Sequence, residues 1–168
     1  ADMDGRFMTV EGGEGTGKST RLKPVANVRS ARRLDGVETR EPGGTPEAEA
    51  LRNLLVNGAA TRWTAEAEAL LNYAARDSHL LKVIRPALAS GQIVLSDRFM
   101  DSTRASQGYA GNFDLALLDC LEAAIVGQAR PDLSILFALD PAAGLALATV
   151  RSGRTAARSP RNGLDFHH

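Results

Sequence analysis

The sequence predicts an α/β fold in which helices flank a parallel sheet, and three observations support this prediction. Apolar runs typical of strands alternate with helical segments along the chain. A glycine-rich turn follows the first apolar run and leads directly into a helical segment. The chain has 168 residues, enough for one domain with its own core, and it shows no internal repeat or linker. We therefore expect a single domain over residues 1–168.

The first half of the chain alternates between strands and helices. We expect the first strand at residues 6–11 and the helix after the glycine-rich turn at 18–33. A weak second strand covers 36–39, and a helix follows at about 47–56, ended by an Asn-Gly pair. The next helix is expected from 65 to about 83.

The second half continues the same alternation. A third strand is expected at 92–96, and Asp114 caps a mostly apolar helix that runs to about 126. A fourth strand covers 133–139, and a further helix begins at the Asp-Pro pair 140–141. The apolar face of helix 114–126 is broad enough to require burial against the core or another subunit. We expect that this face contributes to a homodimer.

The composition excludes some classes of partner and location. The formal net charge is zero, so the sequence gives no sign of attraction to nucleic acid or to an acidic membrane. Cys120 is the only cysteine, which excludes an intrachain disulfide and fits a reducing compartment. No apolar run reaches membrane-spanning length, and no signal-peptide region begins the chain. We expect a soluble, cytoplasmic protein.

The strongest motif is the glycine-rich turn. Its spacing, Gly12-x-x-x-x-Gly17-Lys18-Ser19, fits a P-loop, although a glycine-rich turn that binds nothing is the alternative. Glycines allow backbone N–H groups to curve around a polyphosphate, and the following helix adds positive partial charge. Lys18 can reach the β- and γ-phosphates, and the Ser19 hydroxyl can bind Mg²⁺. The expected ATP-binding residues are Gly12, Gly13, Glu14, Gly15, Thr16, Gly17, Lys18, Ser19 and Thr20.

Charged residues after the strands extend this reading. Asp97 directly follows the third strand, where P-loop proteins place an acid that helps to hold Mg²⁺. Four arginines, Arg40, Arg52, Arg76 and Arg98, lie near carboxyl ends of strands. They suit a phosphate on a second substrate, which needs bidentate donors, although each could instead be a solvated surface residue.

A basic stretch near the end of the chain could serve as a lid over residues 151–163. It contains Arg151, Arg154 and Arg158 among small and polar residues. Such a segment can close over a transferring phosphate and stabilise its charge. The alternative is a disordered basic loop.

Several motifs together resemble the bacterial thymidylate kinases, and the resemblance runs in unbroken order over nearly the whole chain. The matching stretches are EGGEGTGKST at 11–20, TREPGGT at 39–45, YAAR at 73–76, DRF at 97–99 with Ser102, QG at 107–108 and RPDL at 130–133. The resemblance implies a three-layer P-loop NTPase sandwich. The family continues beyond the position of His168 into a fifth strand, so we expect this strand and the rest of a C-terminal part to be missing.

The resemblance also implies roles for single residues. Glu14 would accept a hydrogen bond from the dTMP 3′-hydroxyl, and Arg52 and Arg98 would bind the dTMP phosphate. Pro42 would follow a cis peptide bond. Because the P-loop has no arginine, Arg158 of the lid would stabilise the transition state. The expected catalytic residues are Lys18, Asp97, Arg98 and Arg158, and the expected dTMP site comprises Glu14, Pro42, Arg52, Asn72, Arg76, Arg98, Ser102, Thr103, Ser106 and Gln107.

The chain departs from the family at several of these positions. The family usually has phenylalanine at the position of Asn72 and tyrosine at that of Ser106, where they contact the thymine and the deoxyribose. The lid motif reads Ala-Arg-Ser-Pro around Arg158 instead of Asp-Arg-aromatic-Glu. These differences concern affinity and activity.

The expected reaction is transfer of the ATP γ-phosphate to dTMP, with Mg²⁺ bound to ATP. Arg76, Thr103 and Gln107 would surround the thymine, and Arg76 would donate to its O4, which favours dTMP and dUMP over dCMP. One alternative is another nucleoside monophosphate kinase with a reshaped acceptor pocket. The other is a nucleotide-binding module that no longer catalyses transfer.

Overall fold

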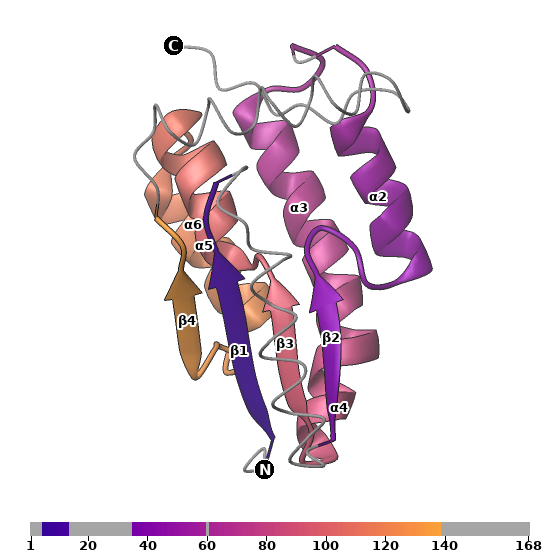
Figure 1. Cartoon of the computed structure of the whole chain (residues 1–168). Coiled ribbons are helices and arrows are strands. Elements are labelled where there is room, and N and C mark those ends of the chain that lie inside the picture. The colour runs from indigo at the N-terminus through magenta and orange to yellow at the C-terminus, as the bar shows by residue number, and fades with distance from the viewer. Residues whose placement is uncertain (1–4, 14–34, 60, 139–168) are drawn as a thin grey trace.

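The structure of the chain is a computed structural model, which describes residues 5–13, 35–59 and 61–138. Its sheet contains the strands β1 (Arg6–Glu11), β2 (Gly36–Arg40), β3 (Ile93–Asp97) and β4 (Leu133–Leu136). All neighbouring strands are parallel, in the order β2-β3-β1-β4 (Figure 1). The prediction of four parallel strands is confirmed. Because β2 lies at the edge, its exposed Glu38 is accommodated.

The register places four hydroxyl side chains side by side across the sheet. Thr39 of β2 pairs with Ser96 of β3, Ser96 pairs with Thr9 of β1, and Thr9 pairs with Ser134 of β4. We call this set the hydroxyl row. Since side chains alternate along a strand, the four hydroxyls point to the same face of the sheet.

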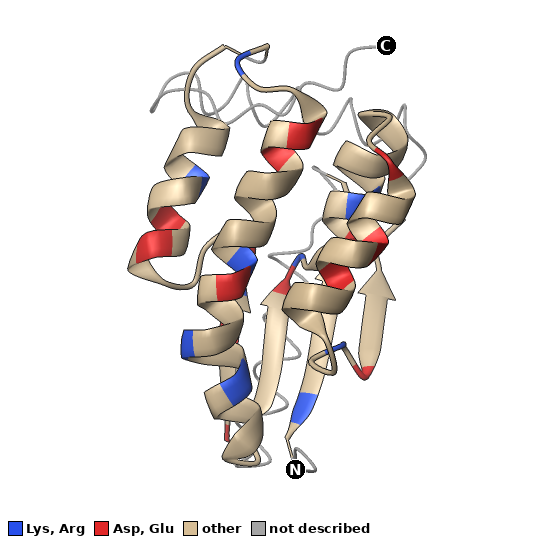
Figure 2. Cartoon of the chain, turned by 180° about the vertical axis from the view of Figure 1, so that it is seen from behind, with Lys and Arg blue, Asp and Glu red and all other residues tan. Residues whose placement is uncertain are grey.

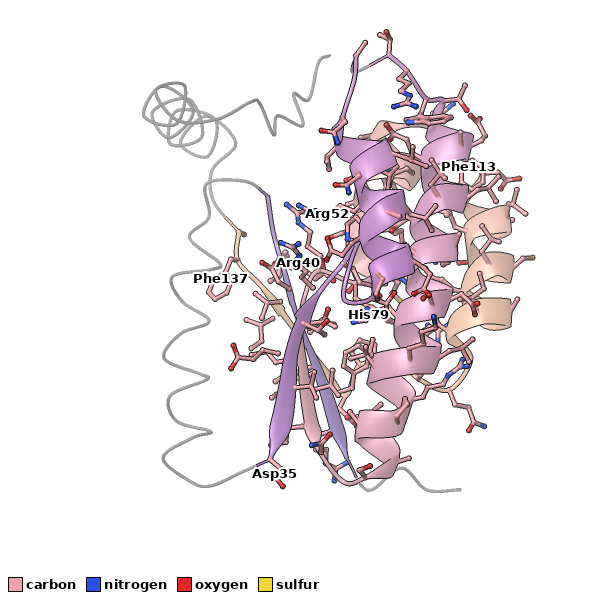
Figure 3. The ribbon with its side chains drawn as sticks, turned by 90° about the vertical axis from the view of Figure 1, so that its right-hand side faces the viewer. Asp35, Arg40, Arg52, His79, Phe113 and Phe137 are labelled. Atoms are coloured by element: carbon pink, nitrogen blue, oxygen red, sulfur yellow. The ribbon has the colours of Figure 1, made fainter. Side chains whose placement is uncertain are left out.

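The described helices cover that face (Figures 1 and 3). They are α2 (Pro46–Val56), α3 (Ala65–His79), η1 (Leu80–Ile84), α4 (Arg85–Ala89), α5 (Met100–Thr103), η2 (Arg104–Ala110), α6 (Leu115–Leu121) and η3 (Glu122–Val126). Figure 2, seen from behind, shows them as one layer in front of the strands. None of the helices in the described ranges is long and apolar enough to span a membrane.

Two predicted boundaries are wrong. The helix expected to end near residue 83 continues through η1 and α4 to Ala89, although Pro86 lies within it. In η1 the turn is wider, because the Arg85 N–H donates to the Leu80 carbonyl five residues earlier, and this wider turn accommodates the proline. The strand β4 ends at Leu136 instead of residue 139. The helices expected at 18–33 and from 140 lie outside the described residues.

An apolar core fills the space between the sheet and the helices toward the amino ends of the strands. It includes Phe7, Leu80, Ile84, Val94 and Phe99, all 1% exposed or less. The Phe7 and Phe99 rings meet edge to face, with centroids 4.9 Å apart. From the hydroxyl row to the carboxyl ends of the strands, the buried side chains are mostly polar. The carboxyl ends are where parallel sheets bind ligands.

Candidate active site

The described part of the P-loop is its beginning. Gly12 directly follows β1 with a φ of +140°, and a Cβ there would lie 2.5 Å from the Phe137 carbonyl oxygen. Only glycine can occupy this position without displacing the backbone next to β4. The other expected ATP-binding residues, 14–20, and the lid arginines Arg151, Arg154 and Arg158 lie outside the described residues.

The loop after β2 contains the expected cis peptide bond. The bond between Glu41 and Pro42 is cis, which confirms the prediction. Arg52 of α2 donates from Nη1 to the Pro42 carbonyl oxygen at 3.2 Å. Gly44 has a φ of +90°, and a Cβ there would lie 2.5 Å from Cδ2 of His79. This loop therefore packs closely on α3 at the carboxyl end of the sheet.

Arg76 of α3 is held at the centre of the site. Its Nε donates to Glu41 Oε2 at 2.7 Å, and its Nη2 donates to Thr103 Oγ1 at 3.0 Å. Its guanidinium carbon lies 4.6 Å from the centre of the Tyr73 ring and 5.0 Å from that of Phe99, in cation–π geometry. The structure thus brings together Arg76 and Thr103, two of the three residues that we expected around the thymine.

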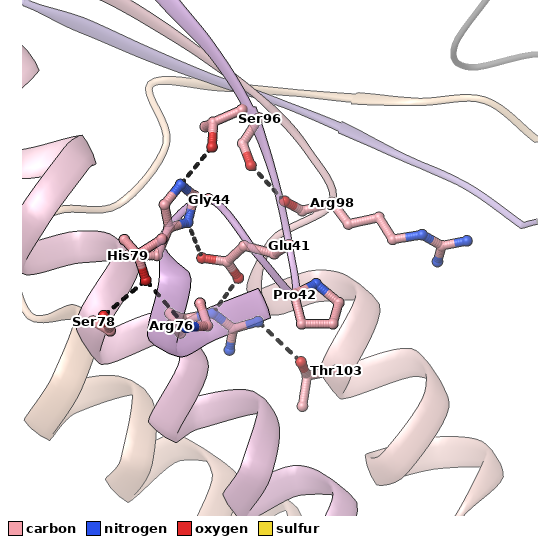
Figure 4. A network of polar contacts seen from close by, with 12 residues as sticks. Glu41, Pro42, Gly44, Arg76, Ser78, His79, Ser96, Arg98 and Thr103 are labelled. Atoms are coloured by element: carbon pink, nitrogen blue, oxygen red, sulfur yellow. Dashed lines mark hydrogen bonds and ion pairs between the residues drawn. The ribbon is translucent and has the colours of Figure 1, made fainter. Parts of the chain in front are cut away.

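Figure 4 shows how the contacts of Arg76 continue into a longer chain of hydrogen bonds. Glu41 accepts from Arg76 with one oxygen and contacts His79 Nδ1 with the other, at 3.0 Å. His79 Nε2 in turn lies 2.7 Å from Thr39 Oγ1 in the hydroxyl row. We call these five residues, Thr39, His79, Glu41, Arg76 and Thr103, the Glu41 network.

Two further expected base contacts lie on the same side of the site. Gln107 of η2 donates from Nε2 to Glu68 Oε2 at 2.9 Å. Asn72 donates from Nδ2 to the Glu68 backbone carbonyl at 2.8 Å, within its own helix. Glu68 therefore connects α3 with η2, and one N–H of the Asn72 amide is engaged within the helix. Ser106 is half-buried in η2, just before Gln107.

The arginines expected to bind phosphate form a positive region at the strand ends. Burial lowers the pKa of Arg52 from its ordinary value, and the positive charges of Arg40 and Arg98 lower it further. Figure 3 shows Arg40 and Arg52 near each other beyond the end of β2. Arg98 has a φ of 70°, an uncommon backbone conformation for a residue with a side chain. Its side chain extends away from the Glu41 network (Figure 4).

Glu11 forms a second buried carboxylate at the end of β1. Its Oε2 accepts from the Ser102 hydroxyl of α5 at 2.5 Å, and its Oε1 has no hydrogen-bond partner among the described residues. Burial raises the pKa of Glu11, while the Ser102 hydrogen bond acts in the opposite direction. Ser102, expected at the dTMP site, is thus held by an acid that begins the P-loop motif.

Asp97 is the expected Mg²⁺ ligand within the described ranges. It ends β3, and its Oδ1 is buried without a hydrogen-bond partner in the described part of the chain. A carboxylate oxygen in this state fits Mg²⁺, which prefers oxygen ligands. The described residues contain no group of three or more acidic, histidine or cysteine side chains that could hold a metal ion by themselves.

The comparisons with known proteins agree with this geometry. The family model described as thymidylate kinase matches residues 10–167. The chain belongs to the thymidylate kinase family. A thymidylate kinase of Caulobacter vibrioides is 50% identical over 163 residues, 97% of this chain and 77% of that protein. One of Rhodopseudomonas palustris is 48% identical over 167 residues, 98% of this chain and 73% of that protein.

A solved structure of the same family also resembles this chain. The crystal structure of thymidylate kinase from Ehrlichia chaffeensis is similar with a TM-score of 0.75 and 32% sequence identity. The similarity covers 91% of this chain and 87% of that one. The resemblance inferred from the sequence motifs is therefore confirmed, as is the α/β fold with a parallel sheet flanked by helices.

The sequence assigned no role to four residues of this candidate site, namely Glu11, Glu41, Glu68 and His79, although it placed His79 on the same helix face as Asn72 and Arg76. Glu11 and Glu41 lie inside recognisable motifs but received no role. His79 is three residues after Arg76, which places it on the same helix face, and this spacing was the available signal. Glu68 gave no signal, since an acid in the first turn of a helix is ordinarily a capping residue.

Proposed function

We propose a division of roles for the reaction of this thymidylate kinase family member, the phosphorylation of dTMP to dTDP by ATP. Arg52 and Arg98 bind the phosphate of dTMP, and Arg76 reads its base together with Thr103 and Gln107. Lys18 contacts the ATP phosphates. Since phosphoryl transfer requires little covalent participation by the protein, these residues act by positioning and by neutralising charge.

The observation that carries the acceptor assignment is the state of the Arg76 guanidinium. Two of its three nitrogens are engaged by Glu41 and Thr103, whereas Nη1 is buried without a partner in the described ranges. A buried donor without a partner costs about 1 to 3 kcal/mol, so an oxygen acceptor at this position is strongly favoured. The O4 of thymine or uracil supplies such an acceptor, and the amino group of cytosine does not.

The phosphate assignment is supported by charge. Arg40, Arg52 and Arg98 are close enough for their charges to lower the pKa of Arg52, so a dianionic phosphate relieves their mutual repulsion. Ser102 and Ser106 lie four residues apart at the start of the helical stretch that carries Thr103. We place them, with Pro42, Asn72 and Glu14, along the nucleoside of dTMP.

Mg²⁺ is expected with ATP, held by Ser19 and Asp97. When bound, the metal ion neutralises charge on the phosphates. The unpartnered Oδ1 of Asp97 is the described feature that supports this assignment. Arg158 is proposed to stabilise the transferring phosphate from the lid.

Steady-state kinetics with two arginine variants test the phosphate assignment. Arg52→Ala should raise the KM for dTMP and lower kcat/KM by about 10- to 100-fold, the effect of losing a charge-assisted hydrogen bond. Arg6→Ala is the control, because Arg6 is an exposed arginine at the opposite end of β1. An unchanged KM for dTMP in Arg52→Ala would refute this role.

Variation of the P-loop tests whether the chain is catalytic. Lys18→Ala should abolish phosphoryl transfer while circular dichroism remains that of the parent, because the β/γ-phosphate contact stabilises the transition state. A single-turnover assay of the parent is the reference. Binding of ATP by the parent without transfer to dTMP would favour the alternative of a non-catalytic nucleotide-binding module.

We also propose a homodimer formed through the outer face of the helix layer. Leu70 of α3, Leu81 of η1 and Leu117 of α6 are 53%, 54% and 47% exposed, and Cys120 of α6 is exposed as well. Leucines exposed at this level on neighbouring helices favour an interface. Light scattering should give twice the monomer mass, and Leu117→Glu should give the monomer mass. A monomeric parent at micromolar concentration would contradict the dimer.

A further inference from the structure

The guanidinium of Arg76 is constrained on nearly every side. Glu41 fixes Nε, Thr103 fixes Nη2, and the rings of Tyr73 and Phe99 lie against the guanidinium carbon. Only Nη1 lacks a described partner. The contact with Glu41 therefore determines which guanidinium nitrogen of Arg76 is left to bind a substrate.

Glu41 is itself oriented by a second partner. Its side chain is 4% exposed, and its Oε1 lies 3.0 Å from His79 Nδ1. As the carboxylate partner of Arg76, Glu41 can only accept hydrogen bonds, so His79 must carry a proton on Nδ1 and donate it. This contact prevents the carboxylate from rotating away from Arg76 Nε.

His79 is oriented in turn by the hydroxyl row. His79 Nε2 lies 2.7 Å from the Thr39 hydroxyl, and in the neutral tautomer that donates from Nδ1 this nitrogen accepts a hydrogen bond from that hydroxyl. The ring is fully buried, and Gly44 packs against its edge. Thr39 is fixed by its place in β2, so the rigid sheet determines the orientation of the imidazole.

We propose that Thr39 and His79 are positioning residues for base selection. Through Glu41 they hold the Arg76 guanidinium so that Nη1 meets the O4 of the pyrimidine, although neither residue contacts the nucleotide. This inference rests on the proposed role of Arg76 as the reader of the base. By this proposal, Thr39 of the sheet contributes to the discrimination of thymine and uracil from cytosine.

A structural role alone would also place hydrogen bonds here, so the test must separate positioning from stability. The hydroxyl row offers a matched pair of variants, Thr39→Val and Thr9→Val. Each replaces a hydroxyl by a methyl group at the same level of the sheet and removes one hydrogen bond, to His79 in one case and to Ser134 in the other. Only Thr39 belongs to the Glu41 network.

The measured quantity is the ratio of kcat/KM for dUMP to kcat/KM for dCMP, because these nucleotides differ only at position 4 and in protonation of N3. Thr39→Val should lower this ratio by about fivefold, the equivalent of one neutral hydrogen bond. Thr9→Val should leave the ratio unchanged while lowering Tm at least as much, because Thr9 is completely buried. Thr39→Ser should restore the ratio of the parent.

Two histidine variants test the direction of the effect. The amide nitrogen of His79→Asn is near the position of Nδ1 and can still donate to Glu41, whereas that of His79→Gln is near Nε2 and cannot. We expect His79→Asn to keep more of the dUMP preference than His79→Gln, even where both lower Tm. The reverse order would overturn the proposed path through Glu41.

The outcomes separate this inference from the proposed function. If the parent fails to phosphorylate dTMP, or uses dUMP and dCMP equally, the proposed role of Arg76 fails. If the parent prefers dUMP and Thr39→Val keeps the full preference, Arg76 reads the base without help from Thr39, and the inference fails alone. Equal losses of preference in Thr39→Val and Thr9→Val would show a general effect of stability and would also overturn it.

Discussion

Glu41 and Glu11 are two buried carboxylates at the same level of the sheet, and they differ in their hydrogen-bond partners. Each lies two residues beyond a threonine of the hydroxyl row, Thr39 or Thr9. Glu41 uses both oxygens, one with Arg76 and one with His79. Glu11 uses one oxygen with Ser102, and its other oxygen has no partner among the described residues.

The difference follows from what the neighbouring helix presents. Opposite Glu41, α3 presents a cation and an imidazole, so the carboxylate acts as a fixed counter-charge. Opposite Glu11, α5 presents the Ser102 hydroxyl but no cation or imidazole, and burial of the carboxylate raises the pKa of Glu11. The first acid positions a side chain that we assign to the substrate, and the second one connects β1 to α5.

The largest expected effect is that of neutralising Glu41. Glu41→Gln leaves the guanidinium of Arg76 buried without a counter-charge and should lower the free energy of unfolding by about 3 to 5 kcal/mol. The control is Glu49→Gln, which breaks the exposed pair of Glu49 with Arg40 and should cost about 0 to 1 kcal/mol. Urea denaturation measures both. Equal losses of unfolding free energy in the two variants would contradict the role of Glu41 as the buried counter-charge of Arg76.

The next largest effect is expected at Gly44, which packs on His79. Gly44→Ala combines a backbone strain of about 1 to 3 kcal/mol with a Cβ placed 2.5 Å from His79 Cδ2. Gly91→Ala is the matched control, since Gly91 also has a positive φ, +74°, but has no atom within 4 Å of its Cβ position. Thermal unfolding should show the larger loss for Gly44→Ala. A Tm no lower than that of Gly91→Ala would show that His79 moves freely.

A smaller effect is expected at Asn72, next to the Glu41 network on α3. One N–H of its amide donates to the Glu68 carbonyl within the helix, and Asn72→Phe replaces this amide, which we place along the nucleoside, by an aromatic ring. The new ring should stack on the base and tighten dTMP binding by about 1 kcal/mol. Calorimetric titration with dTMP gives the Kd. Weaker binding would identify the Asn72 amide as a ligand of the nucleotide.

The smallest effect is a change in pH dependence at Glu11. Because burial raises the folded-state pKa of Glu11 above its ordinary value near 4.5, its contribution to stability is present below pH 4.5. That contribution is lost as pH rises through the raised pKa. Glu11→Gln cannot titrate, so its Tm relative to that of the parent should increase from pH 4.5 toward neutral pH. A constant difference across this range would contradict the raised pKa.

Much of the fold could be predicted from the sequence because local signals were consistent. Strands, turns and helices alternate clearly, and the order of motifs identified the family. The end of the helix that continues past Pro86 could not be predicted, because the wider turn at η1 depends on packing against the core. The order of the strands was also beyond the sequence, since pairing depends on contacts between distant segments.

The site was predictable where a motif names a residue, and less so where a distant partner decides its role. Pro42 and Arg76 lie inside the matching motifs, whereas the roles of Arg52 and Thr103 were implied by the resemblance to the family. Glu41 gains its role from Arg76, 35 residues away, and Glu11 from Ser102, 91 residues away. No local pattern reports such pairs, because they exist only after α3 and α5 have packed on the sheet.

The most direct test of the account is the acceptor preference of the unmodified chain. The measurement is kcat/KM for dTMP, dUMP and dCMP at saturating ATP and Mg²⁺, with Arg76→Lys as the comparison. We expect dTMP and dUMP to be used and dCMP to be used at least about 100-fold less, because cytosine leaves Arg76 Nη1 without an acceptor. Arg76→Lys should lose most of this preference, since an ammonium group cannot reproduce the fixed fork. Equal use of dCMP and dTMP by the parent would contradict the account.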